Sequence, residues 1–330
     1  MRIKTMTATR ITLVAALVGA GIVALSGSAQ AALTTSCVGT AKNVTVPGDL
    51  VVPAGQSCEL TNVVVQGQTT VRADADLVTT RSTFKGRIVV GNNGYLDLDR
   101  TTVSKATSLD MAYGAYFQDS TLTGAVTLTG SGFLYSYGSI HAGQVTSTHG
   151  ETYIESGRLG RNLTTSGDAS TDLTDTVVNG RVSVTGAMFG SVICASEIYG
   201  NAGFSGAGVD GVVQLGTSGT FTDCGYNVFG SNVTVRGNQG PVSISGDVIR
   251  GNLVCSGNAM KPTGSDNRVR GTSTDQCKNL TPAQAAAGPM ARSKMASPKD
   301  RANTVLAKIN HRANAGRAAA TAAGTALIGR

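Results

Sequence analysis

The sequence predicts an all-β protein, a right-handed parallel β-helix (β-solenoid). The first observation is that a turn residue followed by a short apolar strand recurs every 19 residues. A fixed period near 20 residues is typical of solenoids, in which each coil buries its apolar side only by stacking on its neighbours. The turn residues are Gly48, Gly67, Gly86, Lys105, Gly124 and Gly143 and, after a drift of one residue, Arg161, Gly180 and Gly200.

The second observation is a period-2 alternation of aliphatic residues inside each strand. The second position after the turn is Leu50, Thr69, Ile88, Thr107, Val126, Val145, Leu163 and Val182, and the fourth is Val52, Val71, Val90, Leu109, Leu128, Ser147, Thr165 and Val184. Such alternation directs these side chains to one face, here the core. Apolar residues recur later in each coil at Leu77, Leu96 and Leu134, and at Val64, Ile140, Leu159 and Val177. We therefore predict three short strands per coil and roughly eleven or twelve coils.

Three segments follow from composition: a signal peptide (residues 1–31), the β-helix domain (32–280) and a basic, Ala-rich tail (281–330). The first begins with basic residues, continues as the apolar run Ile11–Leu25 and ends in the small-residue site Ala29-Gln30-Ala31. These features predict a secreted, extracellular protein that could associate with a cell wall. An uncleaved anchor is the alternative.

Charge separates the three segments, which carry net charges of +3, −3 and +7. The basic excess therefore belongs to the ends and does not predict nucleic-acid binding by the body. Ser297-Pro298 could cap a helix that runs toward Gly316, with Val305, Leu306 and Ile309 on one side. The tail is expected to be disordered or a short helix, and as a basic segment it could contact an anionic surface.

Six cysteines lie beyond the expected cleavage site. An even number in an exported chain predicts disulfides, and residues about one coil apart stack closely enough to form them. We predict the pairs Cys37–Cys58, Cys194–Cys224 and Cys255–Cys277. The middle pair is expected beside an outward loop between Gly200 and Gly211, where the repeat is irregular. No His/Cys cluster suggests a metal site, and no cofactor motif is present.

No catalytic motif is complete. Glu155 and Asp172 fall at nearly the same place in consecutive coils and are the only candidates for an acid/nucleophile pair. The same two carboxylates could instead hold Ca²⁺ or lie exposed without a catalytic role. The Asp-Asp and GHG strings of pectin-hydrolase-like enzymes are absent. His141 and His149 are expected to be exposed turn residues.

Aromatic residues are concentrated in four consecutive coils. Of the 15 in the chain, eight lie between residues 95 and 153. Stacked rings could form a flat platform for sugar rings, or they could pack inside the solenoid or under a loop. The candidate ligand-binding residues are Tyr95, Tyr113, Tyr116, Phe133, Tyr135, Tyr137 and Tyr153.

Hydroxyl side chains occupy the outward positions of four consecutive coils. The pairs are Thr127/Thr129, Thr146/Thr148, Thr164/Ser166 and Ser183/Thr185. Such a grid resembles the face of solenoid ice-binding proteins, although threonine is also a common polar strand residue.

The region from Cys37 to Cys277 resembles the uncharacterised secreted right-handed parallel β-helix proteins of actinobacteria. The resemblance rests on TAKNVTVPGDLVVPAGQSCEL (40–60) and on VIRGNLVCSGNAMKPTGSDNRVRGTSTDQC (248–277). It implies export and the fold, and it supplies no catalytic residues.

The sequence favours a secreted, non-catalytic β-helix module with a binding or structural role, contacting carbohydrate or a cell-wall polymer. The alternatives are a β-helix polysaccharide lyase or glycoside hydrolase and, less strongly, an ice-binding protein.

Overall fold

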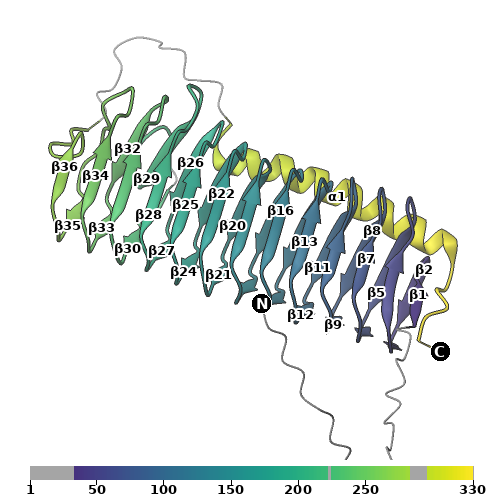
Figure 1. The fold of residues 1–330 in the computed structure, drawn as a ribbon. Coiled ribbons are helices and arrows are strands. Elements are labelled where there is room, and N and C mark those ends of the chain that lie inside the picture. Colours follow the sequence, from purple (N-terminus) through teal and green to yellow (C-terminus); the bar gives the residue numbers. More distant parts are fainter. Residues whose placement is uncertain (1–32, 222–223, 283–295, 330) are drawn as a thin grey trace, which may run out of the picture. The chain divides into compact units, whose positions relative to one another are not determined.

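The computed structural model describes residues 33–221, 224–282 and 296–329, and the expected signal peptide lies outside them. The strands stack as a parallel β-solenoid in which each coil up to β33 contributes one strand to each of three sheets, here called A, B and C (Figure 1). Every strand pairs in parallel with its neighbours one coil away, which confirms the predicted fold class.

Sheet A has 13 strands, sheet B has 11 and sheet C has 12. Sheet A consists of β1 (Thr34–Ser36), β4 (Asp49–Val52), β7 (Thr69–Val71), β10 (Ile88–Val90), β13 (Thr107–Asp110), β16 (Val126–Thr129), β19 (Val145–Thr148), β22 (Leu163–Ser166), β25 (Val182–Thr185), β28 (Ala202–Ser205), β31 (Val233–Arg236), β34 (Leu253–Ser256) and β36 (Ser273–Asp275).

Sheet B consists of β2 (Gly39–Lys42), β5 (Ser57–Thr61), β8 (Asp76–Thr80), β11 (Tyr95–Asp99), β14 (Gly114–Gln118), β17 (Leu134–Tyr137), β20 (Glu151–Glu155), β23 (Ser170–Thr174), β26 (Gly190–Cys194), β29 (Val212–Gly216) and β32 (Val242–Ser245).

Sheet C consists of β3 (Thr45–Val46), β6 (Val64–Val65), β9 (Thr83–Phe84), β12 (Thr102–Val103), β15 (Thr121–Leu122), β18 (Ile140–His141), β21 (Arg158–Leu159), β24 (Val177–Val178), β27 (Glu197–Ile198), β30 (Val228–Phe229), β33 (Val248–Ile249) and β35 (Arg268–Val269).

The 19-residue repeat found in the sequence matches the strand register of sheet A. Leu50 lies opposite Thr69, Thr69 opposite Ile88, and the match continues to Val182. These side chains are all buried, so the alternation does mark the core face. Each inward residue stacks on its equivalent one coil away, which gives the solenoid one continuous core.

In sheet C, the core-facing position predicted from the sequence was wrong by one residue. Ile140 is 45% exposed, and the buried position of its strand is His141. Strands in this sheet are two residues long, and their second residue points inward. Leu159 is nevertheless buried as predicted, because the coil before it is one residue short and Leu159 pairs with His141.

His141 is therefore a core residue and not an exposed turn residue. Burial lowers its pKa to about 4, so the imidazole is neutral. Its Nε2 lies 2.9 Å from the Ser136 hydroxyl. His149, by contrast, is exposed with φ of 59°, as expected of a turn residue.

The three predicted disulfides are all present. Their Cα–Cα distances are 5.6 Å for Cys37–Cys58, 4.9 Å for Cys194–Cys224 and 5.1 Å for Cys255–Cys277. The irregular insertion lies later than predicted, between β29 and β30, and it carries Cys224. It lengthens one coil, so that Ala202 pairs with Val233.

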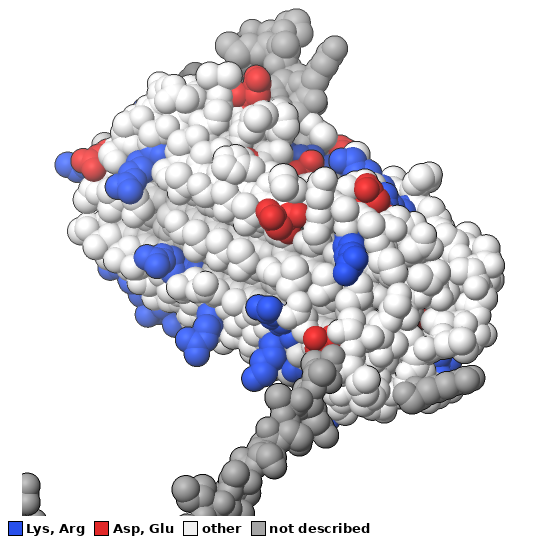
Figure 2. Space-filling model, turned by 45° about the vertical axis from the view of Figure 1, so that its right-hand side comes forward, with Lys and Arg blue, Asp and Glu red and all other residues white. Residues whose placement is uncertain are grey.

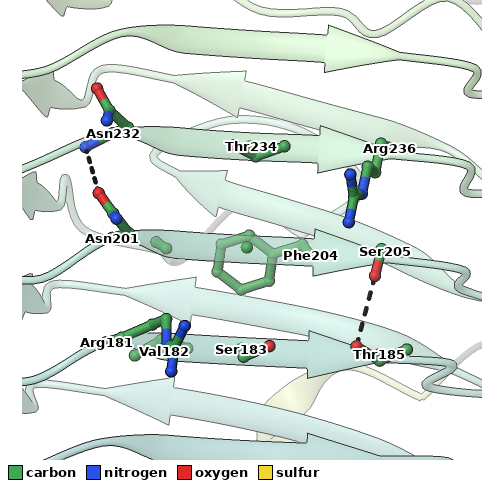
Figure 3. Close-up of a pocket in the computed structure, with 12 residues that line it drawn as sticks. Arg181, Val182, Ser183, Thr185, Asn201, Phe204, Ser205, Asn232, Thr234 and Arg236 are labelled. Atoms are coloured by element: carbon green, nitrogen blue, oxygen red, sulfur yellow. Dashed lines mark hydrogen bonds between the residues drawn. The ribbon is translucent and has the colours of Figure 1, made fainter.

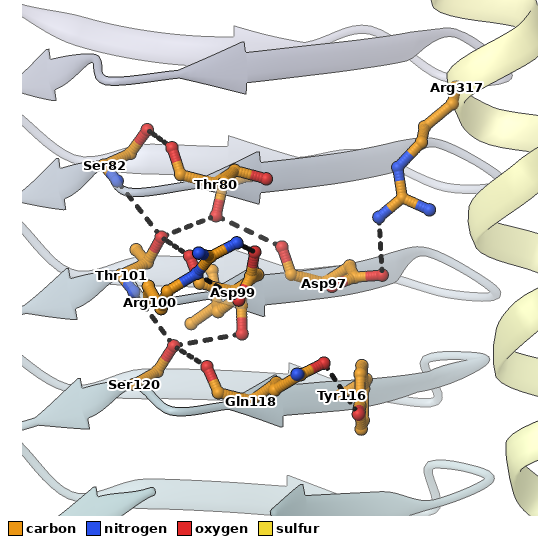
Figure 4. A network of polar contacts seen from close by, with 12 residues as sticks. Thr80, Ser82, Asp97, Asp99, Arg100, Thr101, Tyr116, Gln118, Ser120 and Arg317 are labelled. Carbon is orange, nitrogen blue, oxygen red and sulfur yellow. Dashed lines mark hydrogen bonds and ion pairs between the residues drawn. The ribbon is translucent and has the colours of Figure 1, made fainter. Parts of the chain in front are cut away.

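A ladder of hydroxyl groups runs along the buried corner between sheets B and C. The N–H of each corner residue donates to the hydroxyl one coil later, from Val63 to Ser82, from Ser82 to Thr101 and from Thr101 to Ser120 (Figure 4). These bonds pair the buried backbone groups that the turn removes from the sheets.

The tail forms one long helix, α1 (Pro298–Ala323). Ser297 caps it in a capping box with Asp300, as its sequence predicted, but the helix continues past Gly316. It runs along the outer face of sheet B (Figure 1). In the part of the tail that the structure describes from residue 296 on, the helix has 26 residues and is thus longer than the short helix expected. Among the described residues, no helix has the length and apolar character that a membrane span requires.

Beyond α1 the chain closes the first coil of the solenoid. Thr325 bridges Thr40 of β2, the Thr40 N–H donates to Gly324, and the Ala326 N–H donates to Thr40. Ala326 and Ile328 are buried in the main core. The last residues of the chain therefore cover the open edge of the first strand of sheet B.

Candidate functional site

The predicted aromatic platform exists, but helix α1 covers it. Tyr95, Phe133, Tyr135 and Tyr153 lie together on the outer side of sheet B and are at most 4% exposed. They pack against three residues of α1, namely Val305, Ile309 and Ala313.

The rings also contact one another. Tyr113 meets Tyr95 and Phe133 edge to face, with ring centroids 6.0 and 5.6 Å apart, and Tyr116 packs on Tyr135 at 5.8 Å. Of the seven candidates only Tyr137, at 40%, is largely exposed. The structure thus favours the alternative in which the rings pack within the chain.

Three arginines of α1 pair with three aspartates of sheet B. Arg301 binds Asp172, Arg312 binds Asp76, and Arg317 lies 3.7 Å from Asp97 (Figure 4). Burial raises the pKa of all three carboxyls, that of Asp97 to about 6, and the arginines oppose the rise. Part of the positive charge of the tail is thus paired with carboxylates of sheet B.

The two candidate catalytic carboxylates do not stack. Glu155 lies opposite Thr174, and Asp172 lies opposite Tyr153, two residues along the strand. Asp172 is 4% exposed and paired with Arg301, whereas Glu155 accepts a hydrogen bond from Tyr135 at 2.9 Å. Neither arrangement offers an open acid/nucleophile pair. In the described part of the chain, no group of three or more His, Cys, Asp or Glu residues could hold a metal ion.

The hydroxyl grid on the outer face of sheet A is in the predicted register. Thr127 lies opposite Thr146, Thr146 opposite Thr164, and Thr164 opposite Ser183. A second row runs beside the first through Thr129, Thr148, Ser166 and Thr185. The side chains are half-buried or exposed.

The grid continues into a groove that sequence reasoning missed. Gly203 takes the outward position between Ser183 and Thr234, within a depression of about 350 Å³ that three consecutive coils line. A Cβ added at Gly203 would meet no atom within 4 Å. Arg181 and Arg236 stand at opposite corners of this groove (Figure 3).

Polar groups of neighbouring coils connect across the groove. The Asn232 N–H donates to Asn201 Oδ1 at 3.3 Å, and the Ser205 hydroxyl lies 3.5 Å from that of Thr185 (Figure 3). The alignment of Gly203 with Thr234 was hidden in the sequence by the insertion, which separates Ala202 from its partner Val233.

No protein-family model, curated protein or solved structure matches this chain.

Proposed function

We propose that this protein is a secreted, non-catalytic β-helix module that binds an extracellular polysaccharide through the groove over Gly203, on the part of the outer face of sheet A formed by β25, β28 and β31. Export is supported by the signal-like residues 1–31, by the resemblance to secreted actinobacterial β-helix proteins and by the three disulfides. The choice of face follows from the fold, because α1 already occupies the aromatic side of sheet B.

The observation that carries the proposal is the groove over Gly203. It combines hydroxyl, amide and guanidinium groups on three consecutive strands, β25, β28 and β31. Sugars present hydroxyls that both donate and accept, which such groups can match. Equivalent groups recur at about 4.8 Å from coil to coil, so the face suits an extended polymer better than a single small molecule.

The proposal can be tested by filling the groove with a larger side chain and measuring polysaccharide binding. Gly203→Leu adds a side chain where the structure has free space, and Ser108→Leu makes a similar change at the equivalent outward position of β13. Binding to soluble and insoluble polysaccharides is measured for the full chain, together with release of oligosaccharides. We expect Gly203→Leu to weaken binding and Ser108→Leu to leave it unchanged.

Failure of the wild type to bind any polysaccharide would contradict the proposal. Release of oligosaccharides that Glu155→Gln or Asp172→Asn abolishes would favour the enzymatic alternative.

The hydroxyl grid favours ice binding as a second candidate. Its two rows are regular over four coils, from β16 to β25, and a regular array of threonines is what an ice surface would need. The array is interrupted at Gly203 and Arg236, which makes this candidate weaker. Thermal hysteresis that Thr146→Leu abolishes and Gly203→Leu leaves unchanged would support it.

A further inference from the structure

A row of arginines marks the corner between sheets C and A. Arg161, Arg181, Arg250 and Arg270 each lie after a sheet C strand and before the next sheet A strand of their own coil, and all are exposed. Figure 2 shows basic side chains gathered along one edge of the solenoid, beside a face with little charge.

The two coils between Arg181 and Arg250 carry Asn201 and Asn232 at this corner, and these are the coils of the groove. Asn201 and Asn232 stand at the position of Arg181, directly before a sheet A strand. In the coils of Arg161, Arg250 and Arg270 this position holds Asn162, Asn252 and Thr272, and the three arginines lie one or two residues before it. With a spacing of about 4.8 Å per coil, the row is roughly 24 Å long.

The outer face of sheet A does not compensate this positive charge. From β22 to β34 the outward positions of sheet A hold Thr164, Ser166, Ser183, Thr185, Gly203, Ser205, Thr234, Arg236, Val254 and Ser256, with no acidic residue. Among the residues that the structure describes, no ion pair involves Arg181 or Arg236. On sheet C the exposed Glu197, which accepts a hydrogen bond from Tyr199 at 2.6 Å, offsets only part of this charge.

We propose that the ligand of this face is a negatively charged glycan, whose carboxylates or phosphates bind the arginine row while its sugar rings lie over the groove. This inference rests on the proposed function and specifies its ligand. Guanidinium groups bind carboxylate and phosphate oxygens in charge-assisted, often bidentate hydrogen bonds. Arg181 and Arg236 would bind the glycan on either side of Gly203. Arg161, Arg250 and Arg270 would extend the contact along the solenoid axis.

The experiment compares how tightly the full-length mature protein binds four polymers. They are a polyuronate, a phosphorylated mannan, a neutral mannan and a neutral glucan. Binding is measured at low and high salt for the wild type and for Arg181→Ala, Arg236→Ala and Arg72→Ala. Arg72 is the matched control. It is exposed directly after β7, and the strand register of sheet A places it at the same position in its coil as Arg236 in the coil of β31.

We expect one or both anionic polymers to bind tighter than the neutral ones and to be released by salt. Arg181→Ala and Arg236→Ala should each weaken that binding about tenfold, the usual value of one charge-assisted hydrogen bond, and Arg72→Ala less than twofold. Preference for the polyuronate or the phosphorylated mannan then identifies the anionic group.

Equal binding of neutral and anionic polymers, without salt dependence and with Arg181→Ala behaving like Arg72→Ala, would overturn this inference and leave the proposed function intact. No binding to any of the four polymers would overturn both. Anionic binding that all three variants weaken equally would also overturn it, because the contact would then not lie at the arginine row.

Discussion

Arg301 of helix α1 and Asp172 of strand β23 form a buried ion pair, in which Arg301 Nη2 lies 2.7 Å from Oδ2 and 2.9 Å from Oδ1, and Nε lies 3.1 Å from Oδ2. The residues are 129 positions apart in the sequence. The pair joins the tail to the middle of the solenoid.

Arg301→Ala should destabilise the protein by about 3–5 kcal/mol, because it leaves the Asp172 carboxylate buried without a partner. The double variant Arg301→Met/Asp172→Asn removes both charges and should cost less than the single change. Denaturant unfolding of both variants measures the difference. A single variant that loses less stability than the double variant would show that the pair is not buried as described.

Asp247 should lower stability as the pH rises. It stands in a ladder between Asn227 and Asn267, its Oδ2 is buried without a hydrogen-bond partner, and burial raises its pKa to about 7. Between the ordinary pKa of an aspartate and this raised pKa, the folded state binds a proton that the unfolded state has released. The contribution of this proton to the free energy of unfolding is therefore favourable near pH 4 and is lost as the pH rises to about 7.

Asp247→Asn would place an amide in a ladder of amides. We expect it to raise stability at pH 8 by about 1–3 kcal/mol, the usual cost of an unsatisfied buried polar group, and to change little at pH 4. Unfolding curves at the two pH values check this. Equal effects at pH 4 and pH 8 would contradict a protonated Asp247 in the folded state.

Tyr153→Ala should act on stability, because the ring lies under α1 and its hydroxyl donates to Glu151 at 2.9 Å. The expected cost is about 3–5 kcal/mol, as for other large buried aromatic side chains. Tyr137→Ala is the control, since this ring is 40% exposed and should cost far less. If both variants unfold like the wild type while glycan binding falls, the aromatic platform predicted from the sequence is the ligand site after all.

Ile328→Ala should loosen the first coil, because Ile328 is 5% exposed within the core and its neighbour Leu327 is 72% exposed. We expect a loss of about 2–4 kcal/mol for Ile328→Ala and little change for Leu327→Ala. Hydrogen exchange should locate the loss in β2 and β5. Faster exchange in the last coils instead would show that the tail does not cap the first one.

The 19-residue period was enough to predict the fold and the disulfides Cys37–Cys58 and Cys255–Cys277, because both depend on which residues stack one coil apart. Cys194–Cys224, which are 30 residues apart, were predicted as the pair that remained. Ile140 shows the limit of this reasoning: in a strand of two residues, a shift of one reverses the side that faces the core. The insertion before β30 similarly hid the register that brings Gly203 beside Thr234.

Long-range contacts were beyond the reach of periodicity. Asp172 was expected on the open solenoid wall, and Tyr153 either there or packed under a loop, and nothing in their own coils shows that a helix more than 100 residues later covers them. The cap at Ser297 and the apolar residues Val305 and Ile309 did predict the helix. They could not say which face it meets.

The contact between Thr325 and β2 has a consequence for how the protein is made. A chain is synthesised from its N-terminus, so the first coil is complete in sequence long before residues 324–328 exist. Until then β2 lacks this partner, while later coils can already stack on the other side of the first coil. Closure of the first coil thus waits for residues 284 positions further along the chain. A chain that stops before them keeps an open edge to which other strands can add.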